Sequence, residues 1–319
     1  MRLIMMGTGP FAVPTFRALY DTPHEVVGLI TQPLRSGPAR RPVPAPMREV
    51  AAEHGTPVLD PENVNTESAQ TLLRDLRPDL LIVADYGQIL SPETLGTARL
   101  GGINLHGSLL PKYRGAAPIN WAIYRGERTT GVTVIHMSPR IDAGPTLAQA
   151  ATEIGPEETA PELEIRLAEL GAPLVCRTIE QLAAGQVEPM PQDAGLASPA
   201  RRLRKSDGEV DWSRAASTIR NQIRALEPWP RTSTNRLRVG APPLRLILGP
   251  AHEVPAGEHQ RAEPGTVVVA AGGELVVATG EGWLRLEALQ PAGKRLLSAA
   301  EFLRGYPLAA GDRLGPAIG

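Results

Sequence analysis

The chain has 319 residues, which is more than one hydrophobic core usually holds and favours two domains. Cys176 is the only cysteine, which excludes an intrachain disulfide and a cysteine-based zinc site. The net charge of -1 divides into -6 for residues 1–193 and +5 for residues 194–319. A basic second half favours a polyanionic partner, with an ordinary solvated surface as the alternative.

The N-terminal apolar run lasts only a few residues before Gly7-Thr8-Gly9-Pro10 interrupts it. Such a run is too short for a secretory signal or a membrane span. We therefore expect a cytoplasmic protein without a membrane-embedded part.

Short apolar or β-branched runs alternate with helix-length segments through the first half of the chain. The runs are Leu3–Met6, Val26–Thr31, Leu80–Ala84, Gly102–Leu105 and Val132–Met137. This alternation predicts a parallel sheet flanked by helices. Thr159 and Glu162 form a capping-box pattern at the start of a long helix that ends near Gly185 and closes the first domain.

The second half of the chain is richer in strand-like runs than in helices. Residues 189–205 show no sustained period and are expected to form a linker between a first domain at 1–188 and a second at 206–319. Ser213 can cap a short helix, and strands are expected at Leu244–Leu248, Gly265–Val269, Leu275–Ala278 and Trp283–Leu289. So many short strands favour a small β-barrel or sandwich.

The Gly7-Thr8-Gly9 segment follows the first strand and satisfies the loose dinucleotide pattern G-x-G-x-x-G/A. The second strand ends without the acidic residue that would bind a ribose, so a bound NAD is discounted. Two interpretations stay open, a phosphate site at a helix N-terminus and a tight turn between strand and helix.

Asn104, His106 and Ser108 alternate along the fourth predicted strand and so project to one side of it. A lone His in a strand is more often a core residue than a catalyst. Asp142, however, follows another strand that we expect to be parallel, and neighbouring strand ends would bring it to His106 as a proton-sharing pair. The six His show no ligand spacing, so no metal site is predicted, and Ser108 is not in a nucleophile elbow.

Basic residues gather in three stretches that contain few or no acids. These stretches are the loop at residues 35–42, the linker end at 201–205 and the segment at 228–252. Their spread over a loop, a linker and a strand-rich domain favours contacts with a phosphate backbone.

Several of these segments resemble one family, the formyltransferases that use 10-formyltetrahydrofolate. The resemblance lies in Asn104-Leu105-His106, Gly107-Ser108-Leu109-Leu110-Pro111 and Ile141-Asp142-Ala143-Gly144. In the second half, Val210-Asp211-Trp212, Pro228-Trp229-Pro230 and Leu289–Lys294 are most similar to the members that act on methionyl-tRNA. The similarity extends over nearly the whole chain.

The resemblance implies a Rossmann-like parallel-sheet domain followed by a small, OB-like C-terminal β-barrel. It further implies transfer of the formyl group of 10-formyltetrahydrofolate, a co-substrate, to the amino group of initiator methionyl-tRNA for translation initiation. Asn104 and His106 would then stabilise the oxyanion, and Asp142 would hold His106 and handle the transferred proton. Nothing in the sequence requires more than a monomer.

The family also implies which residues contact the two substrates. The folate pocket is expected to be lined by Tyr86, Gly87, Gln88, Ile89, Leu90, Ser108, Leu109, Leu110, Pro111, Ile141, Ala143 and Gly144. The tRNA is expected to contact Arg40, Arg41, Arg201, Arg202, Lys205, Lys294 and Arg295. The chain departs from the family pattern at Asp85 and at Pro139-Arg140.

Two alternatives are weighed against this interpretation. A formyltransferase for a sugar-nucleotide amine can share the two-domain layout, but the basic residues at 201–205 argue against it. A nucleotide- or RNA-binding module without catalysis would leave Asn104, His106 and Asp142 unexplained.

Overall fold

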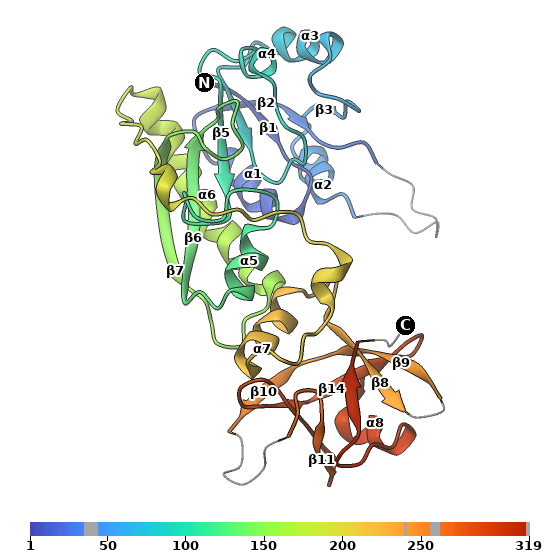
Figure 1. Cartoon of the computed structure of the whole chain (residues 1–319). Coiled ribbons are helices and arrows are strands. Elements are labelled where there is room, and N and C mark those ends of the chain that lie inside the picture. The colour runs from blue at the N-terminus through green and yellow to red at the C-terminus, as the bar shows by residue number, and fades with distance from the viewer. Residues whose placement is uncertain (35–43, 239–240, 256–261, 317–319) are drawn as a thin grey trace. The chain divides into compact units, whose positions relative to one another are not determined.

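The computed structural model describes residues 1–34, 44–238, 241–255 and 262–316 (Figure 1). The chain divides into two compact units. The first comprises Met1–Pro118, Thr129–Glu153 and Glu162–Arg201, and the second comprises Ile119–Arg128, Ile154–Pro161 and Arg202–Gly319. Each unit is therefore built from three separate stretches of the chain.

A seven-stranded sheet in the order β3-β2-β1-β4-β5-β6-β7 forms the centre of the first unit. The strands are β1 (Arg2–Met6), β2 (Glu25–Ile30), β3 (Val58–Leu59), β4 (Leu80–Val83), β5 (Gly102–His106), β6 (Thr129–His136) and β7 (Thr146–Glu153). β1 to β5 pair in parallel, and the chain reverses its direction of winding between β1 and β4. This order confirms the Rossmann-like prediction.

Helices accompany the parallel strands, as the alternating pattern predicted. They are η1 (Pro10–Ala12), α1 (Val13–Leu19), α2 (Pro46–Glu53), α3 (Glu67–Asp75), α4 (Pro92–Leu95), α6 (Ala160–Ala183) and η2 (Ala194–Leu196). The side chain of Thr66 caps α3 by accepting a hydrogen bond from the Ala69 N–H at 3.3 Å. On α6, a Cβ at Gly171 would lie 2.6 Å from a Leu105 methyl carbon, so glycine allows this helix to pack closely on β5.

The second unit contains two antiparallel sheets, which confirms a strand-rich C-terminal domain. One sheet has the order β10-β13-β12-β11 and the other β15-β14-β9-β8-β16. The elements are α5 (Pro118–Tyr124), η3 (Lys205–Gly208), α7 (Ala216–Ala225), β8 (Ser233–Arg238), β9 (Ala241–Leu248), β10 (Ala251–Val254), β11 (Val267–Ala271), β12 (Glu274–Ala278), β13 (Trp283–Leu286), β14 (Ala288–Pro291), β15 (Leu297–Ser298), α8 (Ala299–Gly305) and β16 (Arg313–Gly315).

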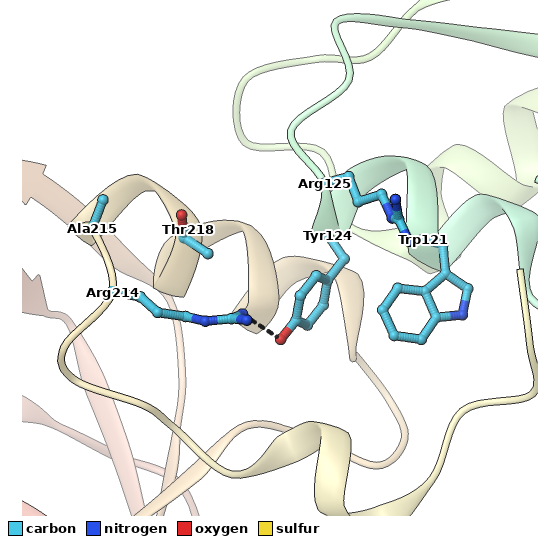
Figure 2. Close-up of a pocket in the computed structure, with 6 residues that line it drawn as sticks. All are labelled: Trp121, Tyr124, Arg125, Arg214, Ala215 and Thr218. Carbon is cyan, nitrogen blue, oxygen red and sulfur yellow. Dashed lines mark hydrogen bonds between the residues drawn. The ribbon is translucent and has the colours of Figure 1, made fainter. Parts of the chain in front are cut away.

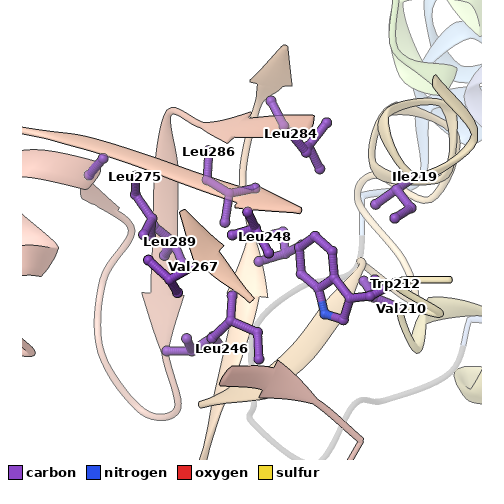
Figure 3. Packing of buried hydrophobic residues seen from close by; sticks show 14 of the residues in the cluster. Val210, Trp212, Ile219, Leu246, Leu248, Val267, Leu275, Leu284, Leu286 and Leu289 are labelled. Carbon is purple, nitrogen blue, oxygen red and sulfur yellow. The ribbon is translucent and has the colours of Figure 1, made fainter. Parts of the chain in front are cut away.

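Both sheets of the second unit contribute to one hydrophobic core (Figure 3). Leu246 and Leu248 of β9 pack with Leu275 of β12 and Leu284 of β13, and all four are essentially inaccessible to solvent. Trp212 lies in the same core, and its indole N–H donates to the Thr234 hydroxyl at 3.0 Å. Apolar residues two apart in these strands therefore bury one face, as the short alternating runs predicted.

Two local predictions are corrected by the structure. The strand at Val132–Met137 was expected to be parallel, but β6 runs antiparallel to β5 and then forms a hairpin with β7. Ser213 was expected to cap the short helix, but α7 begins at Ala216, and the Ser213 hydroxyl donates to the Asp211 carboxylate instead. Ser213 thus lies in a turn that precedes the helix.

Candidate active site

Asn104 and His106 lie two residues apart on β5 and so share one face of the sheet. The His106 side chain is only 6% exposed, and its Nε2 lies 2.9 Å from the Tyr113 carbonyl oxygen. Because a carbonyl can only accept, Nε2 carries a hydrogen and the other ring nitrogen, Nδ1, is left for chemistry.

Asp142 faces that second nitrogen. Its Oδ2 lies 3.6 Å from His106 Nδ1 and accepts a hydrogen bond from the Gly115 N–H at 2.9 Å. Its Oδ1 accepts from Asn104 Nδ2 at 3.4 Å. The three predicted catalytic side chains therefore converge on the Asp142 carboxylate, which is 14% exposed: Asn104 hydrogen-bonds to it, and His106 lies just beyond hydrogen-bonding distance.

The route by which Asp142 reaches His106 differs from the prediction. In the antiparallel β5–β6 pair, His136 at the end of β6 lies opposite Ile103 near the start of β5. The end of β6 is therefore at the opposite edge from His106, and residues 137–145 must fold back over β5. Asp142 adopts a φ of +49° in this loop, a conformation in which Asp is tolerated better than most residues.

Gln192 holds this loop in place, and sequence reasoning missed it. Its Nε2 donates to the carbonyl oxygens of Asp142 at 2.8 Å and Gly144 at 2.7 Å. Its Oε1 accepts from the Arg114 guanidinium at 2.7 and 3.1 Å. One amide thus connects the Asp142 loop to the segment that follows β5, but a single Gln in an irregular stretch carries no sequence signal.

Residues 190–200 contact both loops of the site along their length. Met190 exchanges two backbone hydrogen bonds with Thr146, at 2.8 and 2.9 Å. Further along, the Ser198 carbonyl accepts from Arg114, and the Ala200 N–H donates to the Arg114 carbonyl at 2.7 Å. This segment lies entirely within the predicted linker, and it forms a strap along the loops that carry Asp142 and Arg114.

Ser108 is completely buried, and its hydroxyl donates to the Lys112 carbonyl at 2.7 Å. The side chain of Ser108 therefore closes the turn after β5, in contrast to its expected place in a ligand pocket. Leu110 is also buried, whereas Leu109 and Pro111 remain partly accessible.

The predicted folate-lining loops contain two exposed apolar side chains. Ile89, in the loop after β4, is 64% exposed, and Ile141, beside Asp142, is 56% exposed. Exposed isoleucines next to buried polar groups are suited to a planar ligand with polar edges. Gly87, Gln88 and Ala143 are also accessible to some degree.

Other residues of these loops set the backbone. Leu90 is buried, and Gln88 bonds back to Val64 and Pro61 through its amide. A Cβ on Gly144 would collide with the His136 carbonyl. Tyr86 is 2% exposed and its hydroxyl has no hydrogen-bond partner among the described residues; burial raises its pKa.

The turn after β1 is structural. The Thr8 hydroxyl bonds to the Tyr86 carbonyl at 3.2 Å and accepts from the Gln32 N–H, so it ties together the ends of β1, β2 and β4. A Cβ on Gly9 would collide with the Asp85 carboxylate. A carboxylate directly beside the turn disfavours a bound phosphate, and the tight-turn interpretation of Gly7-Thr8-Gly9 is therefore favoured.

The basic residues expected to contact tRNA are on the surface where the structure describes them. Arg202, Lys205 and Lys294 of the second unit are exposed, as is Arg201 of the first. Arg295 forms an ion pair with Glu301 at 2.7 Å. Arg40 and Arg41 lie outside the described residues. No cluster of three metal-binding side chains occurs in the described part of the chain.

Comparison with known proteins identifies the family of the chain. The formyl transferase family model matches residues 1–179, and the model for the formyl transferase C-terminal domain matches residues 202–307. The methionyl-tRNA formyltransferase of Rhodopirellula baltica is 43% identical, over 98% of this chain and 96% of the relative. That of Roseiflexus castenholzii is 42% identical over 99% of both. The chain belongs to the methionyl-tRNA formyltransferase family.

Solved structures confirm the fold of this formyltransferase family member. An N-formyltransferase from Helicobacter canadensis, solved with folinic acid and dTDP-3-aminofucose, matches with a TM-score of 0.65. It is 16% identical, and the match covers 91% of this chain and 98% of that one. At this identity the likeness shows the fold alone. Among the described helices, none has the length and apolarity needed to cross a membrane.

Proposed function

We propose that the protein transfers the formyl group of 10-formyltetrahydrofolate to the α-amino group of initiator methionyl-tRNA. Asn104, His106 and Asp142 converge in one site, and this convergence is the observation that carries the proposal. Membership in the family supports the choice of methionyl-tRNA as acceptor.

The reaction forms a bond between the amine nitrogen and the formyl carbon and breaks the bond from that carbon to folate N10. In the tetrahedral intermediate the former carbonyl oxygen carries a negative charge. The Asn104 amide has a second N–H beyond the one that faces Asp142, and a protonated His106 offers its Nδ1–H, so both can donate to this oxygen.

The Asp142 carboxylate faces Nδ1 of His106 while the Tyr113 carbonyl occupies Nε2, so Asp142 orients the imidazole and leaves Nδ1 for proton transfer. The attacking amine must lose one proton and folate N10 must gain one. A carboxylate and an imidazole in contact can receive the first and supply the second, so the two residues act as a pair.

The folate is proposed to bind along the loops after β4 and β6. Exposed Ile89 and Ile141 would cover the faces of its pterin ring, and backbone groups of residues 86–90 and 141–144 would bond to its polar edge. The exposed basic side chains Arg202, Lys205 and Lys294, together with Arg201, are proposed to contact tRNA phosphates.

Substitution of Asp142 tests the proposed roles. Asp142→Asn keeps the shape of the side chain but removes the negative charge beside His106 and the oxygen that can accept a proton. We expect kcat for formylation of Met-tRNA to fall about a hundredfold or more, with an unchanged melting temperature. The matched control is Asp193→Asn, an exposed carboxylate that accepts a hydrogen bond from the Gly195 N–H of its own turn. Full activity of the Asp142 variant would refute the role assignment.

The acceptor is tested separately with wild-type protein. Formyl transfer is measured to initiator Met-tRNA and, in parallel, to a dTDP-linked amino sugar. We expect transfer to Met-tRNA only, and transfer to the amino sugar alone would replace the proposed acceptor with a sugar nucleotide.

A further inference from the structure

A pocket of about 540 Å³ lies in the second unit, between α5 and the start of α7 (Figure 2). It is lined by Trp121, Tyr124, Arg125, Arg214, Ala215 and Thr218. The volume lies in the range of small-molecule sites, which is roughly 300–1,000 Å³. The pocket contains no residue of the catalytic group.

One face of α5 forms one wall of the pocket. Trp121, Tyr124 and Arg125 follow one another at i, i+3 and i+4 on α5 and therefore share one face. Ala122 and Ile123, on the opposite face, are buried in the protein. The Trp121 and Tyr124 ring centroids are 5.2 Å apart and the rings are tilted by 56°, so the two rings present different surfaces to the pocket.

A positive charge is held on the other wall. The Arg214 guanidinium donates to the Tyr124 hydroxyl at 3.0 Å and lies 6.0 Å from the centre of the Tyr124 ring (Figure 2). Asp211 is 3.9 Å away, at the limit of an ion pair, and its carboxylate already accepts two bonds from Ser213. Arg214 is 45% exposed, so a ligand in the pocket can reach it.

Aromatic faces beside an arginine recognise a particular chemistry. Bases stack on Trp or Tyr rings because every base has a π face, and guanidinium groups bind phosphate oxygens. A purely apolar ligand would desolvate the Arg214 charge and leave only the distant Asp211 carboxylate to compensate it, and a bare anion would make no use of the Trp121 ring. A ligand that carries both a planar ring and a phosphate uses both walls.

We propose that this pocket binds one unpaired nucleotide of the tRNA substrate, with its base against Trp121 and its phosphate at Arg214. The inference depends on the proposed function for the identity of the RNA. The basic composition of the second half of the chain favours RNA over a free nucleotide as the source of the ligand.

The experiment measures the Kd of the full-length protein for initiator tRNA by filter binding. Trp121→Leu removes the stacking surface and is expected to weaken binding about tenfold. The matched control, Trp121→Phe, keeps an aromatic ring and should recover most of the affinity. Melting temperatures of both variants establish that they are folded.

Arg214→Gln tests the phosphate contact by a different readout. It should reduce the slope of log Kd against log salt by about one, whereas Trp121→Leu should leave the slope unchanged. The charge control is Arg99→Gln, an exposed arginine of the first unit paired with Asp79. It should change neither the affinity nor the slope.

Unchanged tRNA affinity in Trp121→Leu and Arg214→Gln would overturn the proposal. Adenosine monophosphate is tested in the same proteins, and loss of its binding with tRNA affinity intact would assign the pocket to a free nucleotide instead. Formylation of Met-tRNA by the wild type is assayed independently, so its failure would refute the proposed function while the binding data still decide the pocket.

Discussion

Each oxygen of the Asp142 carboxylate accepts one hydrogen bond. The Gly115 N–H donates to Oδ2 and the Asn104 amide donates to Oδ1, while His106 Nδ1 lies 3.6 Å from Oδ2. A carboxylate with both oxygens occupied has little rotational freedom. Its position against His106 is therefore fixed before any substrate binds, which is what electrostatic catalysis requires.

The ionisation of Asp85 is perturbed. Its carboxylate lies against Gly9, and desolvation raises its pKa to about 6, while the residue as a whole keeps exposed surface. The pKa in the folded chain thus lies above the ordinary value of 3.8, so the native state binds a proton more tightly than the unfolded chain. Ionisation of Asp85 then destabilises the fold as the pH rises from about 4 to about 6.

Asp85→Asn should therefore raise the melting temperature at pH 7.5 and have no effect at pH 3.5, where Asp85 is already neutral. Because solvent screens an exposed group, we expect a gain of only about 1–3 °C at the higher pH. Scanning calorimetry of both proteins at both pH values provides the measurement. A gain at pH 3.5 that vanishes at pH 7.5 would contradict the assigned direction.

At the scale of elements, the site depends on the hairpin of β6 and β7. The convergence of Asn104, His106 and Asp142 could be predicted because the three residues lie in motifs that few other proteins share. Their geometry could not, because a run such as Val132–Met137 has the same apolar pattern whether its strand is parallel or antiparallel. The contacts of the strap at residues 190–200 could not be predicted either, because its bonds are mostly to backbone groups.

Gln192→Leu should separate the positioning of Asp142 from its chemistry. The substitution leaves the carbonyls of Asp142 and Gly144 and the Arg114 guanidinium without their shared partner. We expect kcat to fall about 10- to 100-fold with a smaller change in the KM for Met-tRNA, because a loosened loop misplaces Asp142.

Gln186→Leu is the control for this change, because Gln186 is exposed and its backbone N–H, which the substitution keeps, donates to the Gln181 carbonyl. Equal losses in the two variants would show that the effect arises from the surface of the segment and not from the clamp on Asp142.

At the scale of the whole molecule, the second unit is not simply the C-terminal part of the chain. Arg220 ion-pairs with Glu157 at 2.8 Å and also bonds to the Pro156 carbonyl, and Arg224 donates to the carbonyls of Gly155 and Glu158. Asn120 on α5 donates to the Ala225 carbonyl at 2.8 Å. α7 therefore packs against two stretches from the first half of the chain. Composition breaks in the sequence predicted a second domain but gave no sign of these distant contributions.

A fragment of residues 202–319 should accordingly be less stable than the same residues in the full chain. In the fragment Arg220 keeps Glu253 but loses Glu157, an exposed contact whose loss costs about 0–1 kcal/mol. Arg224 loses the carbonyls of Gly155 and Glu158, partly buried bonds that are each worth about 1.5–3 kcal/mol. Amide hydrogen exchange of β9 and β12 in the fragment and in the full chain measures the difference. Equal protection would contradict a structural role for residues 119–128 and 154–161.

The mixed origin of the second unit has a practical consequence for recombining these enzymes. A chimera that joins the first 201 residues of one relative to the C-terminal part of another would set α5 from one parent against α7 from the other. The Asn120, Arg220 and Arg224 contacts would then cross a boundary between two lineages. We expect functional chimeras to be those that exchange residues 119–128 and 154–161 together with the C-terminal part. The exchanged unit then consists of three separate stretches of the sequence.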